Sequence, residues 1–158
     1  MIKVLIADDH AFVRSALADL LNGTDDIRVV AECADGSEVA EAAARTHPDV
    51  VLMDLQMPWM SGLEATEALR DTEPDARVIL LTGSLSAAAA REALALGVVG
   101  FLLKADDAGD ALPVQIRAVA AGGTAWNPAV AVEPRGRRTG PTAPRGPRRR
   151  FAWGSRAC

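Results

Sequence analysis

Three carboxylates follow two apolar runs of this chain, and their positions predict a shared site. The run KVLIA, residues 3–7, leads into Asp8 and Asp9, and the run DVVLM, residues 49–53, leads into Asp54. Neighbouring carboxylates at the ends of buried strands repel one another and lose hydration, so a chain that gathers them has usually built a site for a hard cation or a phosphoryl group. A single aspartate is more often a cap or a solvated loop residue. The doublet and the singlet together favour Mg²⁺ binding, with one carboxylate as the nucleophile that forms an aspartyl phosphate.

Two further polar residues follow apolar runs in the same way. Thr82 ends the run 77–82, and Lys104 follows the run 100–103. A hydroxyl and an ammonium group can each bind a phosphoryl oxygen, the lysine as a compact point charge. Taken singly, Thr82 is a strand-end cap and Lys104 a solvated surface residue. Because both residues follow strands, as the carboxylates do, we expect all of them at one edge of the sheet. Together they could bind and transfer a phosphoryl group. His10, next to the acidic pair, is interpreted as a loop residue and not as a ligand.

The elements that position these residues alternate between strands and helices. The predicted strands are rich in Val, Ile and Leu on both faces, as buried parallel strands are. They are residues 2–7, 28–33, 49–53, 77–82 and 98–103. Helices are predicted at about residues 13–22, 37–45, 61–71, 87–96 and 110–121. Five βα units predict a doubly wound α/β fold, in which ligands bind at the carboxyl ends of the strands.

Charge divides the chain into two parts. Residues 1–132 carry 9 Lys/Arg against 20 Asp/Glu, a balance of −11, whereas residues 133–158 carry 8 Arg against one Glu, a balance of +7. The last part is dense in Arg, Pro and Gly and has no apolar period, so it cannot bury enough surface to offset its ordering entropy. We therefore expect a folded domain over residues 1–123 and a disordered basic tail over residues 124–158.

Composition also excludes several classes of protein. The apolar runs are far shorter than the ~20 residues of a transmembrane helix, and the N-terminus lacks the layout of a signal peptide. Cys33 and Cys158 form neither a metal-ligand spacing nor a disulfide framework. A soluble, cytoplasmic protein with no membrane partner is expected.

Five motifs, in order and in register, resemble the receiver domain of bacterial two-component response regulators. They are LIADDH (5–10), VVLMDLQMP (50–58), SGLEAT (61–66), LLTGS (80–84) and GFLLK (100–104). The resemblance covers about residues 1–123 and is greatest to the NarL/FixJ (LuxR-type) subfamily. It implies a flavodoxin-like fold with a five-stranded parallel sheet in the order 2-1-3-4-5 and five helices.

The resemblance also implies roles at the matching positions. Asp54 would accept a phosphoryl group from a sensor histidine kinase. Mg²⁺ would be bound directly by Asp9, Asp54 and the backbone carbonyl of Gln56, and by Asp8 through a water molecule. Lys104 would pair with the phosphoryl oxygens.

The same family implies a conformational switch. Thr82 would move to bond the phosphoryl group, and Phe101, otherwise a strand-core aromatic, would turn inward. Such a protein transfers and releases its own phosphoryl group but is not a turnover enzyme, and phosphorylation-linked homodimerisation is expected. Regulators of this subfamily continue into a helix-turn-helix domain, which the Arg/Pro/Gly-rich tail cannot build, so DNA binding of that kind is in doubt.

Alternatives remain at this point. The tail is interpreted first as a truncated or frame-shifted remnant, then as a solvated segment, and last as a site for nucleic acid or an acidic partner, with Phe151 and Trp153 beside the arginines of residues 148–150. This last interpretation would make the chain a binding module. A haloacid-dehalogenase-like phosphohydrolase also uses a strand-end aspartate, but it would need a second aspartate where Gln56 stands.

Overall fold

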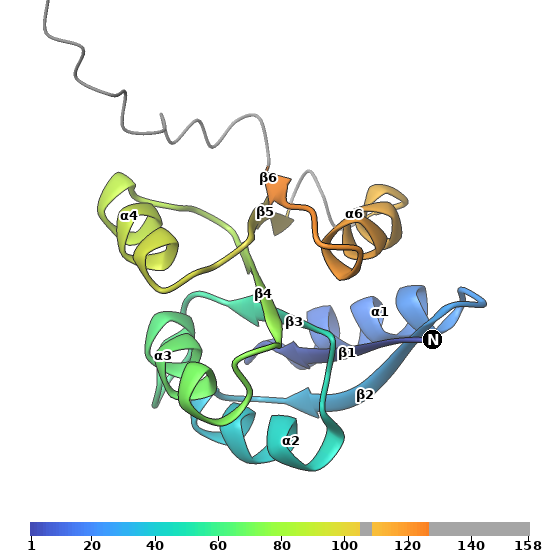
Figure 1. Ribbon diagram of the computed structural model, residues 1–158, viewed down its shortest axis with the longest axis horizontal. Helices are drawn as coiled ribbons and strands as arrows, with labels where there is room; N and C mark the ends of the chain where they lie inside the picture. Colours follow the sequence, from blue (N-terminus) through green and yellow to red (C-terminus); the bar gives the residue numbers. More distant parts are fainter. Residues whose placement is uncertain (105–108, 127–158) are drawn as a thin grey trace, which may run out of the picture.

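One parallel sheet in the order β2-β1-β3-β4-β5-β6 forms the centre of the fold (Figure 1). The strands are β1 (Ile2–Ala7), β2 (Ile27–Cys33), β3 (Val50–Asp54), β4 (Arg77–Thr82), β5 (Gly100–Leu103) and β6 (Ala125–Trp126). The order reverses at β1, which pairs with β2 on one side and β3 on the other. The predicted doubly wound sheet 2-1-3-4-5 is confirmed, and β6 adds a sixth strand to it.

This computed structural model describes residues 1–104 and 109–126. The helices in those ranges are α1 (Ala11–Asn22), the 3₁₀ turn η1 (Gly36–Glu38), α2 (Val39–Thr46), α3 (Gly62–Thr72), α4 (Ala87–Ala95) and α6 (Ala111–Ala120). The five predicted helices are therefore present, with ends shifted by a few residues, as is usual where helices fray. No helix in the described ranges has both the length and the hydropathy that a membrane crossing requires.

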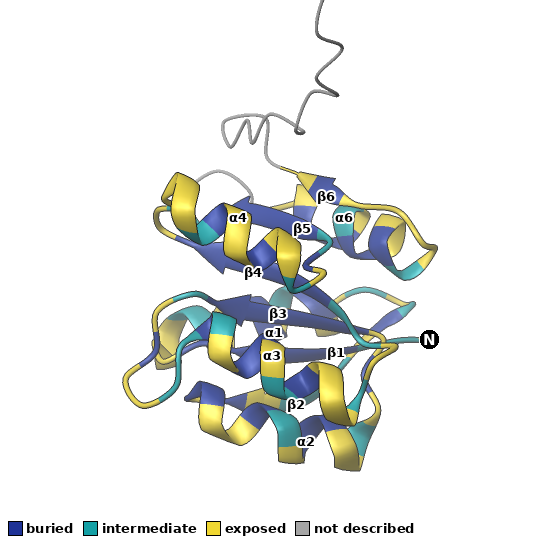
Figure 2. Ribbon diagram, turned by 60° about the vertical axis from the view of Figure 1, so that its left-hand side comes forward, coloured by how far each residue is buried: buried dark blue, intermediate teal, exposed yellow. Residues whose placement is uncertain are grey.

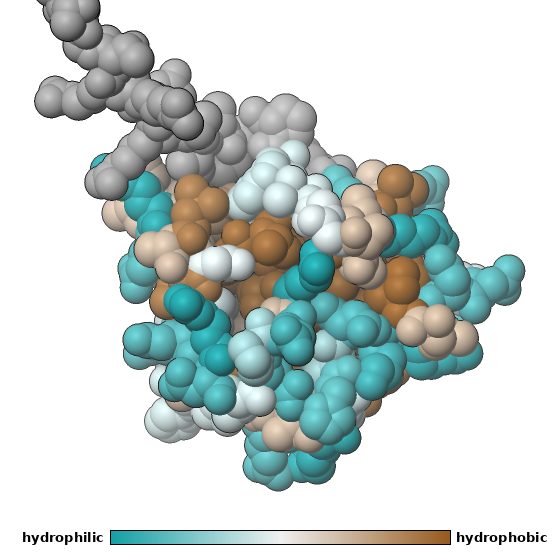
Figure 3. Space-filling view, viewed as in Figure 1, coloured by the Kyte–Doolittle hydropathy of each residue, from teal (hydrophilic) through white to brown (hydrophobic). Residues whose placement is uncertain are grey.

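Helices cover both faces of the sheet, as the apolar character of the strands requires. On one face α1 and α6 bury Leu17, Leu21 and Ile116 against β1, β3 and β4. On the other face α2, α3 and α4 supply smaller side chains, among them Ala43 and Ala93. The central strands β1, β3, β4 and β5 are largely buried, the edge strand β2 is only partly buried, and the outer faces of the helices are exposed (Figure 2). Hydrophilic residues dominate the side of the molecule formed by α2 and α3 (Figure 3).

Hydrogen bonds between Ser61 and Glu64 determine where α3, the helix after β3, begins. The Ser61 hydroxyl accepts the Glu64 N–H at 3.3 Å, and the Glu64 carboxylate accepts the Ser61 N–H at 2.9 Å. These bonds lower the pKa of Glu64. Ser61 and Glu64 therefore form a capping box, which fixes where α3 begins. Pro113 lies in the first turn of α6, where its missing N–H would have had no helical acceptor.

The strand β6 lies just beyond residue 123, the expected end of the folded part. It pairs with β5 so that Ala125 is opposite Gly100 and Trp126 is opposite Phe101. The Phe101 and Trp126 rings lie 5.1 Å apart, centroid to centroid, with their planes tilted by 44°. The tail was expected over residues 124–158, and its residues 127–158 lie outside the described part of the chain.

Gly100 allows this close pairing, because a Cβ there would lie 2.5 Å from the Ala125 carbonyl oxygen. Gly100→Ala is therefore expected to displace β6 and to lower the free energy of unfolding by about 1–3 kcal/mol, as overpacking does. Gly109→Ala is the matched control, since a Cβ at Gly109 meets nothing within 4 Å. Thermal melts followed by circular dichroism compare the two variants; equal melting temperatures would contradict the steric argument.

Candidate functional site

The three predicted carboxylates meet at the carboxyl end of the sheet. Asp8 directly follows β1, and Asp54 ends the neighbouring strand β3. Carboxylate oxygens of Asp8, Asp9 and Asp54 and a ring nitrogen of His10 all lie within 4.8 Å of one another. Asp8 is 2% exposed and Asp54 5%, whereas the Asp9 side chain is 28% exposed. Two buried acids and one open acid therefore share a single site.

Lys104, directly after β5, bridges the two buried acids. Its Nζ lies 2.6 Å from Asp8 Oδ2 and 3.2 Å from Asp54 Oδ2. Burial lowers the pKa of Lys104, but the adjoining carboxylates of Asp8 and Asp54 outweigh burial and raise it. The lysine therefore stays charged and offsets part of the repulsion between the two acids.

Asp54 is electrostatically strained in this setting. Burial is the largest influence that raises the pKa of its carboxyl group, and the nearby charge of Asp8 raises it further. Lys104 and the backbone N–H of Gln56, which lies 3.5 Å from Asp54 Oδ1, act in the opposite direction without cancelling the rise. A buried carboxylate beside a second negative charge is stabilised most by a nearby cation.

The backbone around Asp8 is held by several contacts that the sequence did not reveal. Arg14 donates from Nη1 to the Asp8 carbonyl at 2.6 Å, and the Asp8 N–H donates to the Cys33 carbonyl at 3.0 Å. His10 donates its N–H to Asp8 Oδ1 at 2.8 Å, and its Nδ1 lies 3.0 Å from Asp9 Oδ1. His10 was expected to be an ordinary loop residue, yet its ring borders the carboxylate cluster.

The donor set fits Mg²⁺. Carboxylate oxygens are the hard ligands that this ion prefers. Apart from its ion pair with Lys104, the buried Oδ2 of Asp8 has no hydrogen-bond partner in the described ranges, so it retains capacity to accept one. Gln56 lies in the loop after β3, next to the cluster. The individual roles given to Asp9, Gln56 and the other ligands remain predictions.

The two expected switch residues lie on neighbouring strands β4 and β5. Thr82 is buried, and its hydroxyl donates to the Ser84 carbonyl at 2.8 Å. In the described part of the chain no hydrogen bond joins Thr82 to Asp54 or Lys104. Phe101 is buried and packs against Trp126. The structure thus places Thr82 at the same edge as Asp54 with its hydroxyl bonded within its own loop.

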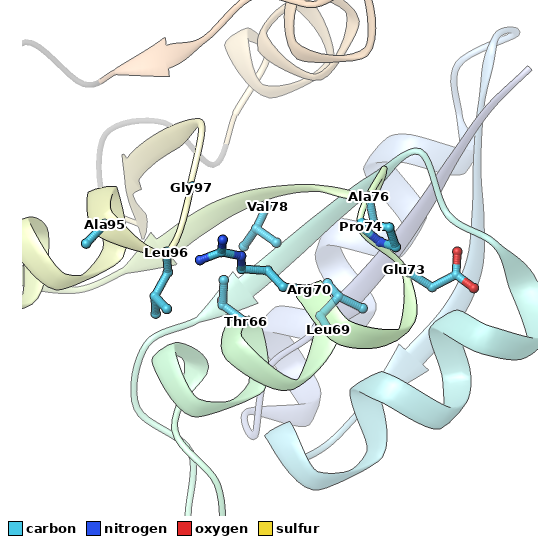
Figure 4. A pocket seen from close by; sticks show the side chains of 10 residues that line it. All are labelled: Thr66, Leu69, Arg70, Glu73, Pro74, Ala76, Val78, Ala95, Leu96 and Gly97. Carbon is cyan, nitrogen blue, oxygen red and sulfur yellow. The ribbon is translucent and has the colours of Figure 1, made fainter.

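A hollow of about 180 Å³ lies elsewhere, between α3, the start of β4 and the end of α4 (Figure 4). Val78, near the amino end of β4, lines it, whereas Thr82 marks the opposite end of the same strand. Its charged residues are Arg70 and Glu73, and Glu73 already lies 2.9 Å from His47 Nδ1. This hollow is therefore separate from the carboxylate cluster.

Comparison with known proteins agrees with this geometry. Residues 4–112 match the response regulator receiver domain family. The transcriptional regulatory protein LnrK of Bacillus subtilis (strain 168) is 38% identical over 128 residues, which cover 81% of this chain and 58% of LnrK. The chain therefore spans little more than half the length of that relative.

Solved structures share the fold. A two-component response regulator of the LuxR family from Aurantimonas sp. SI85-9A1 is 34% identical, with a TM-score of 0.75 and coverage of 82% of this chain and 91% of that one. The isolated REC domain of RcsB from Salmonella enterica serovar Typhimurium, in the presence of phosphomimetic BeF3−, is 26% identical, with a TM-score of 0.73 and coverage of 82% and 95%.

Proposed function

Because this chain belongs to the response regulator receiver domain family, we propose that it accepts a phosphoryl group on Asp54 from a sensor histidine kinase. Receiver domains of this family interact with sensor histidine kinases and are generally not turnover enzymes. The observation that carries the proposal is the buried Asp54 carboxylate, with Lys104 Nζ 3.2 Å from one oxygen and two further carboxylates beside it. The haloacid-dehalogenase-like alternative is not the family that matches.

The transfer step follows from the chemistry of the side chains. An oxygen of Asp54 attacks the phosphorus of a phosphohistidine, a P–O bond forms, and the P–N bond breaks. The departing imidazole nitrogen keeps the bonding electron pair and takes up a proton from water. The product is an aspartyl phosphate, and no oxidant or reductant is needed.

Charge is the main obstacle to this step. Lys104 offsets negative charge because its Nζ already lies between Asp8 and Asp54. Asp9, Asp54 and the carbonyl of Gln56 would hold Mg²⁺ directly, with Asp8 acting through water. When bound, the ion neutralises charge on the phosphoryl oxygens and orients them.

Phosphorylation replaces a carboxylate with a larger, more highly charged group and thereby biases the neighbouring elements. The Thr82 hydroxyl would leave the Ser84 carbonyl and donate to the phosphoryl group, and Phe101 would shift its ring in response. The consequences we propose are a phosphorylation-linked homodimer and a cytoplasmic role in transcription regulation, the activity named for LnrK. The solved RcsB receiver with phosphomimetic BeF3− supports the phosphorylation chemistry.

Metal removal tests the proposal. With acetyl phosphate and Mg²⁺, the wild-type chain is expected to gain one phosphoryl group, seen by intact-mass spectrometry. Excess EDTA is expected to slow this uptake by at least about tenfold, since the charge of the transferring group then lacks its main counter-ion. Restoring Mg²⁺ should restore uptake. Equal uptake with and without EDTA would contradict a metal-assisted site.

A further inference from the structure

A buried carboxylate outside the acidic cluster holds the loop that follows Asp54. Asp35, between β2 and η1, is 6% exposed. Its Oδ2 accepts the Ser37 N–H at 2.9 Å within its own loop, and its Oδ1 accepts the Trp59 N–H at 3.0 Å. In the described ranges it forms no ion pair. Backbone N–H groups therefore satisfy this carboxylate, and one of them belongs to a loop 24 residues away.

The electrostatics agree with an ionised Asp35. Burial alone would raise the pKa of its carboxyl group, but the N–H groups of Ser37, Trp59 and Met60 outweigh burial and lower it. Hydrogen bonds to an ionised acceptor are stronger than neutral ones. The bonds from the loop after β3 are thus of the stronger kind.

The neighbouring residue brings the two loops into direct backbone contact. A Cβ on Gly36 would lie 2.3 Å from the Met60 carbonyl oxygen, so only glycine permits this approach. The loop after β3 is also closely packed at its two ends. The Gly62 N–H donates to the Leu55 carbonyl at 2.9 Å. A Cβ on Gly62 would lie 2.2 Å from the Asp54 carbonyl oxygen. Residues 55–61 are therefore held at both ends and, through Asp35, in the middle.

This loop carries groups that the proposed chemistry uses. Gln56 lies in it, and its N–H faces Asp54 Oδ1. Trp59, three residues further on, has an 88% exposed side chain, so packing of its ring does not hold the loop in place. The Asp35 bond to the Trp59 N–H therefore fixes the backbone at a point where the side chain is exposed, while Leu55, Met57 and Met60 of the same loop pack against the core.

We propose that Asp35 is a positioning residue for the phosphorylation site, which holds residues 55–61 so that Gln56 can serve the bound cation. This inference rests on the proposed function, because it concerns Mg²⁺ binding beside Asp54. Residues that orient the groups around a metal typically change its affinity by about 10–100-fold when they are removed.

The test compares full-length wild type with Asp35→Ala, Asp35→Asn and Glu38→Ala. Glu38 is the matched control, because its carboxylate accepts the Ala34 N–H at 2.9 Å within the same loop, and in the described ranges no hydrogen bond or ion pair joins it to residues 55–61. Isothermal titration with Mg²⁺ alone is expected to give a Kd roughly tenfold higher for Asp35→Ala. Asp35→Asn, which retains an acceptor oxygen, should show a smaller increase, and Glu38→Ala should match wild type.

A kinetic readout separates positioning from stability. Phosphoryl uptake from acetyl phosphate by Asp35→Ala should be slow at low Mg²⁺ and should recover at saturating Mg²⁺. If Asp35→Ala does not fold by circular dichroism, Asp35→Asn decides the question. A lower melting temperature with an unchanged Mg²⁺ Kd, or an equal loss of affinity in Glu38→Ala, overturns the role of Asp35. Wild type that neither binds Mg²⁺ nor takes up phosphate overturns the proposed function as well.

Discussion

Asp54→Asn is expected to abolish phosphoryl uptake from acetyl phosphate and to raise the melting temperature of the metal-free protein. Uptake stops because an amide is not a nucleophile toward phosphorus at neutral pH. Stability rises because the native state no longer contains a buried carboxylate close to Asp8. Lys104 retains a partner in this variant, since Asp8 Oδ2 lies 2.6 Å away.

The gain in stability from Asp54→Asn should depend on pH. Burial, and then Asp8, raise the pKa of Asp54 above its unfolded value. Its favourable contribution to folding is therefore fully present below the ordinary carboxyl pKa and is lost as pH rises through the raised value. The gain from Asp54→Asn should accordingly be large at neutral pH and shrink in acid. Asp71→Asn, at an exposed position of α3, should change neither uptake nor stability. A lower melting temperature for Asp54→Asn would contradict the electrostatic argument.

Lys104→Met is expected to lower the free energy of unfolding of the metal-free protein by about 3 kcal/mol at neutral pH. Removal of one partner from a buried ion pair typically costs ~3–5 kcal/mol, and the lower end applies because the Lys104 side chain is 19% exposed. The loss arises because Asp8 and Asp54 then face each other without a counter-charge. Urea denaturation followed by circular dichroism measures it.

Added Mg²⁺ and low pH should each reduce the stability that Lys104→Met loses. Mg²⁺ at the proposed site would bind the folded state and supply the missing charge, so we expect millimolar Mg²⁺ to restore part of the stability. Lowering the pH should do the same, because burial and the charge of Asp8 raise the pKa of Asp54, and its protonation removes the repulsion. Arg91→Met, at an exposed position of α4, is the control and should be close to neutral. A deficit that responds to neither Mg²⁺ nor pH would show that lost packing, not charge, destabilises the variant.

Much of the site could be predicted because parallel strands bring their carboxyl ends to one edge. Asp8, Asp54 and Lys104 each stand at the end of a strongly apolar run, so correct strand assignment was enough to place them together. Thr82 followed from the same reasoning. Their separations and the pairing of Lys104 with both acids required the structure, because these depend on side-chain conformations.

The residues that were missed act through contacts between segments distant in sequence. Asp35 precedes a glycine, which indicates a turn, but nothing local indicates that it accepts the N–H of Trp59. The strand β6 has only two residues and therefore no period to detect. Its position follows from the fit of Ala125 against Gly100, which is a property of the folded sheet.

The most direct test of the central claim is to locate the phosphoryl group. Wild type treated with acetyl phosphate and Mg²⁺ is reduced with borohydride, which converts an aspartyl phosphate into homoserine, and the peptides are sequenced by mass spectrometry. The structure predicts homoserine at position 54 alone, because Asp54 ends β3 beside Lys104 and the other acids. Homoserine at Asp8 or Asp9, or at no aspartate in a sample that contains folded protein and Mg²⁺, would contradict the account.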